Sequence, residues 1–297
     1  MARHYFSNGI CYGSHSAGEA SPSRRPEGPW RAPREKTEKS LKEPPLSRYE
    51  RARHLPVHRG KVRMTNLRIA LQERVIIADG AMGTMLQAAD LSLDDFEGHE
   101  GCNEIINITR PEVVADIHRE YFAAGSDAVE TNTFGCNWAN LAEYGIEDRI
   151  YELAHAGARI ARMSADEFSA ENKTGPKYVL GSLGPGTKLP SLLHTTYEHL
   201  KQAYREASRG LIDGGADALL IETTQDLLQA KAAINGAREA IDSTDRDILL
   251  IAQVTIETTG TMLMGSEIGA ALSALEPLNI DVIGLNCATG PTEMSEH

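Results

Sequence analysis

The stretch GADALLIETT, residues 215–224, has the layout that decides the fold. A helix-ending glycine and a nearby aspartate come first, a run of apolar residues follows, and glutamate and threonines close the stretch. The stretch GSDAVETNT, residues 125–133, repeats this layout, and NIDVIGLNC, residues 279–287, is a looser third copy. Continuous apolar runs are typical of parallel strands that are covered on both faces. The repeat therefore predicts β/α units whose strands end in polar side chains.

Six apolar runs of this kind lie in the last four-fifths of the chain, with helical segments between them. The predicted strands cover residues 74–80, 127–133, 177–184, 217–224, 247–256 and 281–287. One expected helix, PEVVADIHREYFAAG at residues 111–125, opens with proline and closes with glycine. This alternation fits either a doubly wound open sheet or a (β/α)8 barrel. In both folds, ligands meet the carboxyl ends of the strands.

The first predicted turn, DGAMGTM at residues 79–85, favours the barrel. A dinucleotide-binding sheet needs G-x-G-x-x-G after its first strand, whereas these two glycines are three positions apart and the other required position holds none. We therefore expect an α/β fold of the (β/α)8 TIM-barrel type over residues 64–297. At roughly 30–40 residues per unit, that length holds about six of the eight units, and about 70 further residues would complete the barrel.

Residues 1–63 have a different composition from the rest. They hold 7 of the 13 prolines, and they contain 14 Lys/Arg against 6 Asp/Glu, which gives this segment a charge of +8. Because the net charge of the whole chain is −12, the remainder carries −20. Without a periodic apolar pattern, such a segment is typical of disorder. We expect a solvated basic extension here rather than a nucleic-acid-binding arm, because acids are interspersed and aromatic residues are sparse.

The overall composition predicts a cytoplasmic protein that binds neither nucleic acid nor membrane. No apolar run approaches the ~18 residues that span a bilayer, the extension is too acidic for a transit peptide, and the remainder is strongly acidic. The four cysteines are few and irregularly spaced, which argues against a disulfide framework.

Polar residues at the ends of the predicted strands are the candidates for ligand binding. Asp79 is suited to a substrate ammonium group, although it is equally suited to capping the helix that follows. Glu130 and Asn132 lie two apart on one strand and face the same way. A buried carboxylate is costly unless it is paired, which favours a ligand-facing role for Glu130 and Glu222. An ion pair with a neighbouring Lys or Arg is the alternative for both.

Cys287, in VIGLNCATGP at residues 282–291, is the most specific single feature. A free cysteine in an apolar strand is more often a core residue than a nucleophile or a ligand. Its position at a strand end, before a loop signal, favours the site. A catalytic thiolate would need a nearby histidine base, and zinc would need three or four ligands; neither arrangement is complete in this chain. Cys102 and Cys136 lack C-x-x-C spacing, and core packing is the alternative for them too.

Several stretches taken together resemble a known family. The chain is similar to the homocysteine-binding module of cobalamin-dependent methionine synthases, within the homocysteine S-methyltransferase superfamily. Five stretches carry the similarity and occur in the same order: IADGAMGTMLQ, CNEIINITRPEVVADIHREYFAAGSDAVETNTFG, VLGSLGPG, GGADALLIETTQDLLQAKAA and IGLNCATGP. The similarity covers roughly residues 67–294. It implies a (β/α)8 barrel that transfers a methyl group to the sulfur of homocysteine and yields methionine.

The resemblance also implies roles for individual residues. Cys287 matches the first of three cysteine ligands to Zn²⁺, and the other two, an adjacent pair in the last strand, have no counterpart before His297. Asp79 and Glu222 match the acids that hold the amino acid part of homocysteine, and Asn132 is a weaker match. The implied donor is methylcobalamin on a separate module that a folate-binding module recharges. The chain would thus be a fragment that is inactive alone.

Two alternatives remain open on the sequence. One is a single-barrel homocysteine methyltransferase that uses S-methylmethionine or betaine, although the contexts ETNTFG and CNEIINITRP favour the synthase. The other is a non-catalytic truncated remnant, in which Cys287 is a core residue.

Overall fold

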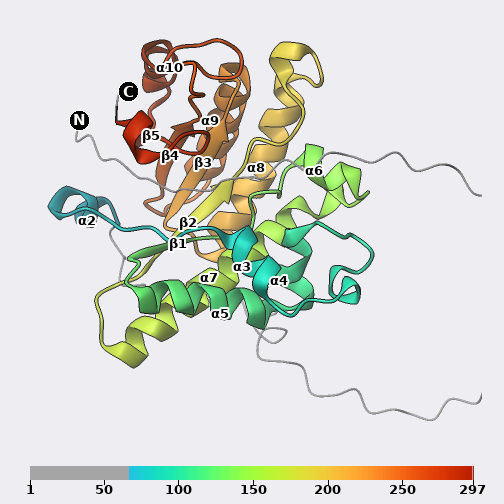
Figure 1. The fold of residues 1–297 in the computed structure, drawn as a ribbon, viewed down its shortest axis with the longest axis vertical. Coiled ribbons are helices and arrows are strands. Elements are labelled where there is room, and N and C mark those ends of the chain that lie inside the picture. The colour runs from blue at the N-terminus through green and yellow to red at the C-terminus, as the bar shows by residue number, and fades with distance from the viewer. Residues whose placement is uncertain (1–66, 296) are drawn as a thin grey trace, which may run out of the picture.

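The apolar runs form a parallel sheet in the computed structural model, which describes residues 67–295 and 297. Within that range the sheet has five strands, each parallel to the next along the chain (Figure 1): β1 (Ala128–Glu130), β2 (Tyr178–Leu183), β3 (Ala218–Thr224), β4 (Leu249–Val254) and β5 (Val282–Leu285). The predicted α/β class with a parallel sheet is confirmed. Over the described residues the sheet is open between β1 and β5, so closure into a barrel stays a prediction. The predicted extension at residues 1–63 lies outside the described residues.

The first predicted strand, residues 74–80, is not part of this sheet, so five of the six predicted strands are present. The segment lies beside β1, and the carbonyl of Ile77 accepts hydrogen bonds from the amides of Asp127 and Ala128 at 2.7 and 3.2 Å. Two carboxylates replace the rest of the ladder: Asp127 Oδ2 accepts from the Ile77 amide at 3.0 Å, and Asp79 Oδ1 accepts from the Glu130 amide at 2.9 Å. The amides of Ile77 and Glu130 thus donate to side-chain carboxylates, whereas in a regular sheet they would donate to backbone carbonyls of a neighbouring strand.

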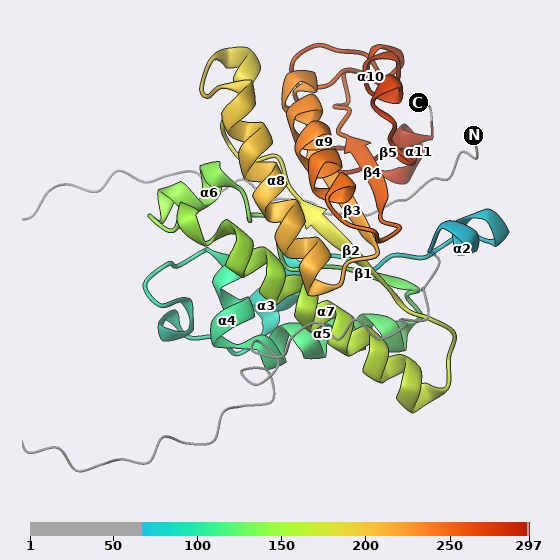
Figure 2. The same cartoon turned by 180° about the vertical axis from the view of Figure 1, so that it is seen from behind.

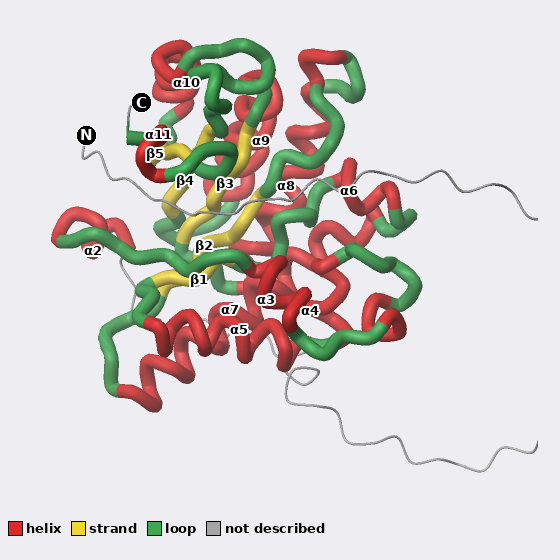
Figure 3. The backbone as a smooth tube through the Cα atoms, in the orientation of Figure 1, coloured by secondary structure: helices red, strands yellow, loops and turns green. Residues whose placement is uncertain are grey.

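Helices follow the strands and cover one face of the sheet (Figure 2). The longer ones are α5 (Pro111–Ala124), α7 (Ile150–Asn172), α8 (Tyr197–Gly214), α9 (Leu227–Asp242) and α10 (Ile268–Leu275). Short helices lie in the connections, as Figure 3 shows: α3 (Met82–Ala88), α4 (Ile106–Thr109), α6 (Trp138–Glu143) and α11 (Pro291–Met294). No helix of the described part is both long and apolar enough to cross a membrane.

The strands alternate between two environments. Val179, Leu219 and Leu250 are examples of the side chains that point to the helix-covered face and join its core. The opposite face carries two zones, because successive side chains on one face are two residues apart. The zone near the amino ends of the strands is apolar, and the zone near their carboxyl ends is polar. The apolar zone contains Ala128, Tyr178, Leu180, Ala218, Leu220, Leu249, Ile251 and Val282. The polar zone contains Glu130, Ser182, Glu222 and Gln253.

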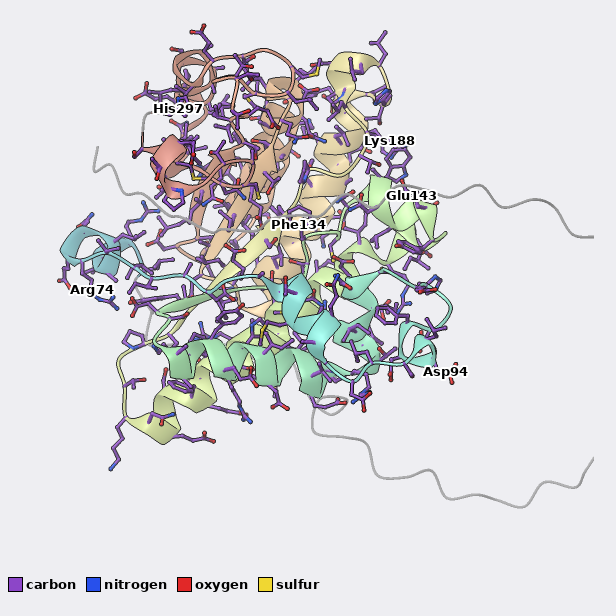
Figure 4. All side chains as sticks on the ribbon, in the orientation of Figure 1. Arg74, Asp94, Phe134, Glu143, Lys188 and His297 are labelled. Atoms are coloured by element: carbon purple, nitrogen blue, oxygen red, sulfur yellow. The ribbon has the colours of Figure 1, made fainter. Side chains whose placement is uncertain are left out.

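Helix α2 (Leu67–Glu73) covers the apolar zone. Its buried Leu67, Ala70 and Leu71 pack in the same cluster as the apolar side chains of that zone. Ion pairs fix both ends of the helix: Arg68 binds Asp247 and Asp281 near the starts of β4 and β5, and the Arg74 side chain binds Asp127 before β1. Arg74 is labelled in Figure 4. The amino ends of the strands are therefore covered, and the polar zone at the carboxyl ends is left for a ligand.

Candidate functional site

A cavity of about 670 Å³ lies at the carboxyl ends of the strands. Its walls come from the loop after residue 79, the turn before α4, the ends of β1, β2 and β3, and the loops after β4 and β5. Phe134, labelled in Figure 4, belongs to the loop after β1. No Lys, Arg or His is among the described residues that line the cavity. Four glutamates are: Glu104, Glu130, Glu222 and Glu257. Such a site favours a positively charged group.

Asp79 is buried beside this cavity, and its neighbour Gly80 forms part of the wall. One carboxylate oxygen accepts the Glu130 amide, and the other, Oδ2, is buried without a hydrogen-bond partner among the described residues. Helix α3 is capped by Ala81 and receives no side-chain hydrogen bond at its start. The capping alternative for Asp79 is therefore wrong. An oxygen left in this way lacks the hydrogen bonds that buried carboxylates ordinarily have.

Glu222 is buried at the end of β3 and binds neutral groups. Its Oε1 accepts from the Ser182 hydroxyl at 2.6 Å, and its Oε2 accepts from Asn286 Nδ2 at 3.2 Å and from the Thr223 hydroxyl at 3.5 Å. Across the described residues Glu222 forms no ion pair with Lys or Arg, which removes the ion-pair alternative for this carboxylate.

The pKa values of the two carboxyls are raised because both groups are buried. Burial, together with a smaller effect of the negative charge of Glu222, raises the pKa of Asp79 to about 8. Burial likewise raises the pKa of Glu222 to about 7, against hydrogen bonds from Ser182 and Thr223 that lower it. A cation between these carboxyls would stabilise both in their charged forms.

We expect the stability of the folded chain to fall as pH rises from about 4 to 8. A carboxyl whose pKa is higher in the folded than in the unfolded state binds more protons when folded at every pH between the two values, so stability is lost as pH rises from the ordinary pKa of Asp79, 3.8, to its folded value of about 8. The thermal unfolding midpoint, followed by circular dichroism, should decrease over this range. Asp79→Asn should flatten the decrease, because the amide does not titrate. Equal slopes in the two proteins would contradict the raised pKa of Asp79.

Asn132 lies in the cavity wall, but its amide group is already bonded to the protein. Its Nδ2 donates to the Asn103 carbonyl at 2.8 Å and to Asn107 Oδ1 at 3.1 Å. In return, Asn107 Nδ2 donates to the Asn132 carbonyl at 2.8 Å. These bonds tie the loop after β1 to α4 through Asn107 and to the turn before α4 through Asn103, so Asn132 shapes the cavity wall.

Cys287 follows β5 and lines the same cavity, partly exposed. Its Sγ lies 3.5 Å from Thr223 Oγ1 and 3.5 Å from Asn286 Nδ2. Cys102 and Cys136 are buried in the helix-side core, and burial raises the pKa of the Cys102 thiol to about 12. The core alternative therefore describes Cys102 and Cys136, whereas Cys287 is at the site.

Two residues of this site were not singled out from the sequence. Glu104 is buried in the wall, accepts the Gly135 amide at 2.7 Å, and has its pKa raised by burial. It follows no strand, so the search for polar strand ends passed over it. In the sequence, Thr223 looks like any other hydroxyl residue at a strand end. Only its backbone conformation in the structure distinguishes it.

The fold and the site together define an α/β protein with a cavity at the carboxyl ends of parallel strands, the place where barrel enzymes bind their ligands. Residues 76–297 match the family described as homocysteine S-methyltransferase, and the chain belongs to that methyltransferase family.

Relatives with known names support this membership. The chain is 63% identical over 233 residues to the methionine synthase of Mycobacterium tuberculosis and 60% identical over the same length to that of Mycobacterium leprae. Each alignment covers 78% of this chain and 19% of the relative, so the chain spans about a fifth of their length.

Solved structures share the fold. The homocysteine methyltransferase MmuM from Escherichia coli in its apo form has a TM-score of 0.59 at 21% identity, covering 77% of this chain and 78% of that one. Its metallated form has a TM-score of 0.53 at 20% identity, covering 77% and 97%. At this identity the likeness concerns the fold.

Proposed function

We propose that the chain is the homocysteine-binding module of a methionine synthase, in which the sulfur of homocysteine takes a methyl group from methylcobalamin and methionine forms. The observation that carries the proposal is a pair of buried carboxyls: Glu222 lines the cavity that also contains the thiol of Cys287, and Asp79 lies beside it. A pair of carboxyls that repel each other is suited to an ammonium group. Homocysteine has an ammonium at one end and a thiol at the other.

In this proposal Asp79 and Glu222 receive the ammonium group of homocysteine. The buried Oδ2 of Asp79 gains a partner, and the proton held by the pair at neutral pH is replaced by a bound cation. Asn132 contributes by fixing the wall through Asn103 and Asn107 rather than by direct donation from its amide nitrogen. The residues of this chain thus orient the amino acid part and leave its thiol directed toward the Cys287 side of the cavity.

The metal part of the proposal needs ligands from outside the described residues. Cys287 is a suitable first thiolate ligand for Zn²⁺, because it lies at the cavity and is partly exposed. Within residues 67–295 and 297, however, no group of three His, Cys, Asp or Glu side chains gathers to hold a metal ion. The described residues therefore do not complete a zinc site. Zinc, when bound, lowers the pKa of a coordinated thiol and so favours the nucleophilic thiolate.

The methyl donor and the partner modules are proposed from the relatives. The methionine synthases at 60–63% identity are about five times longer than the matching region, which leaves room in those proteins for cobalamin-binding and folate-binding modules. The identity of 60–63% to the methionine synthases supports methylcobalamin over S-methylmethionine or betaine as the donor. A cytoplasmic location and the absence of nucleic-acid binding stay predictions.

Calorimetric titration of the purified chain with L-homocysteine tests the proposed function. Binding should be lost with 4-mercaptobutyrate, which keeps the thiol and lacks the amino group, because Asp79 and Glu222 would have no cation to bind. Equal binding of both compounds would contradict the assignment of these carboxyls.

Zinc content provides a separate test of the metal proposal. The chain should bind zinc weakly and show no methyl transfer to homocysteine on its own, because one thiolate is too few for a stable zinc site. Metal analysis after dialysis against zinc measures this, with Cys287→Ser as the control. Tight stoichiometric zinc that homocysteine protects from a chelator would overturn the inference that Cys287 lacks co-ligands among residues 67–295 and 297.

A further inference from the structure

The end of strand β3 has an irregular backbone that brings two side chains to the cavity. The register with β4 shifts between Ile221 and Thr224, and Thr223 has a φ of +56°. This left-handed conformation is unusual and energetically costly for a β-branched residue. In a regular strand Glu222 and Thr223 would face opposite sides of the sheet, whereas here both line the cavity.

Asn286 holds Thr223 in this conformation through both ends of its carboxamide. Its Oδ1 accepts the Thr223 amide at 2.9 Å, and its Nδ2 donates to Thr223 Oγ1 at 2.9 Å. The assignment of oxygen and nitrogen follows from the backbone amide, which must donate. Nδ2 also donates to Glu222 Oε2 at 3.2 Å. Asn286 is buried, and its backbone carbonyl accepts from the Thr255 hydroxyl at 3.1 Å, so its position is fixed against the end of β4.

Thr223 connects this arrangement to the thiol. Because Oγ1 accepts from Asn286, its own hydrogen is available to Cys287 Sγ or to Glu222 Oε2, each 3.5 Å away. Cys287 and Ala288 also have positive φ values, 61° and 57°. Strained backbone thus occurs at Thr223 and at Cys287. The Glu222 carboxylate and the Cys287 thiol are linked through hydrogen bonds to Asn286 and Thr223.

We propose that Asn286 is a positioning residue that sets the separation between the Glu222 carboxylate and the Cys287 thiol by holding Thr223 in the left-handed conformation. The inference rests on the proposed function, in which a single homocysteine molecule spans these two groups. Beyond the proposed function, we infer that the backbone conformation at Thr223 determines the distance between the Glu222 carboxylate and the Cys287 thiol, and that the Asn286 carboxamide maintains this conformation.

Substitutions in an Asn286→Ala background distinguish this role from simple packing. Asn286→Ala should weaken L-homocysteine binding at least tenfold and should speed iodoacetamide labelling of Cys287 at least threefold, measured by peptide mass spectrometry. Adding Thr223→Gly should recover threefold or more of the affinity and slow the labelling again, because glycine adopts positive φ without cost. Adding Thr223→Val, which keeps the branched side chain, should recover neither. Equal behaviour of the two double variants would overturn the proposal.

Two further comparisons keep the test decisive. Labelling of Cys287 with iodoacetamide needs no homocysteine. If the wild-type chain does not bind homocysteine, the proposed function is wrong, but the order of the labelling rates still tests the positioning role of Asn286. If Asn286→Ala does not fold, Asn286→Asp keeps the acceptor for the Thr223 amide but loses the donor to Thr223 Oγ1 and to Glu222. It should label Cys287 faster than the wild-type chain and more slowly than urea-unfolded protein. A rate for Asn286→Asp equal to that of urea-unfolded protein would also overturn the proposal.

Discussion

Glu222→Gln is expected to weaken L-homocysteine binding by about 100-fold, or roughly 3 kcal/mol, at pH 8. The substitution keeps the size of the side chain and an oxygen that accepts from Ser182. It removes the negative charge opposite the ammonium group and leaves the ligand with Asp79 alone. Hydrogen bonds between charged groups in a buried site contribute more than neutral ones, so the loss should be large. Calorimetric titration of the two proteins measures it.

Glu257→Gln is the matched control for this substitution. Glu257 lines the same cavity, and its replacement changes the charge by the same amount. It lies beyond the end of β4, in a different part of the wall, and its change should alter affinity less than threefold. If both substitutions weaken binding equally, the cavity attracts homocysteine through its overall negative charge, and the specific role of Glu222 is wrong.

Gly157→Ala is expected to destabilise the chain by about 3 kcal/mol, although alanine is the better helix former. Gly157 lies in α7 against the loop after β1. An added Cβ would come within 2.5 Å of Thr133 Cγ2 and 2.9 Å of Asn107 Nδ2. Neither neighbour can move freely, because Thr133 donates to the Ser182 carbonyl and Asn107 donates to the Asn132 carbonyl. The substitution should therefore disturb the cavity wall as well as the core.

Gly269→Ala provides the comparison, because Gly269 is also helical and a Cβ there would meet no atom within 4 Å. Helix propensity alone predicts that both substitutions stabilise the chain by up to about 1 kcal/mol. Urea denaturation of both variants separates the two effects. Stabilisation by Gly157→Ala would show that the wall can move away at little cost.

Much of the fold follows from local pattern. The apolar runs at residues 177–184 and 217–224 became strands, and the glycines at positions 125 and 215 end their helices with φ values of 116° and 112°. Residues 74–80 have the same apolar content and were predicted as a strand. They are not part of the sheet, because Asp79 and Asp127 bind the amides that pairing would use. Apolar content does not reveal such competition between side chain and backbone.

The candidate site was predictable where it depended on strand ends. Glu222, Asn132 and Cys287 are all at the carboxyl end of the sheet, because parallel strands place their ends along one edge, and Asp79 reaches the same edge through its bond to the Glu130 amide. Their individual environments were not predictable. Asn132 is bound to Asn103 and Asn107 rather than presented with free donors, and that depends on a turn distant in sequence.

The sequence by itself determined the class of fold, the edge of the sheet where the polar residues gather, and the family to which the chain belongs. These features depend on residue type and spacing along one segment at a time. Only the tertiary structure decided that Asp79 and Glu222 are both buried, with the charge of Glu222 adding to the raised pKa of Asp79, and that Asn286 holds Thr223 in a left-handed conformation next to Cys287. Both depend on distances between strands, which no single segment encodes.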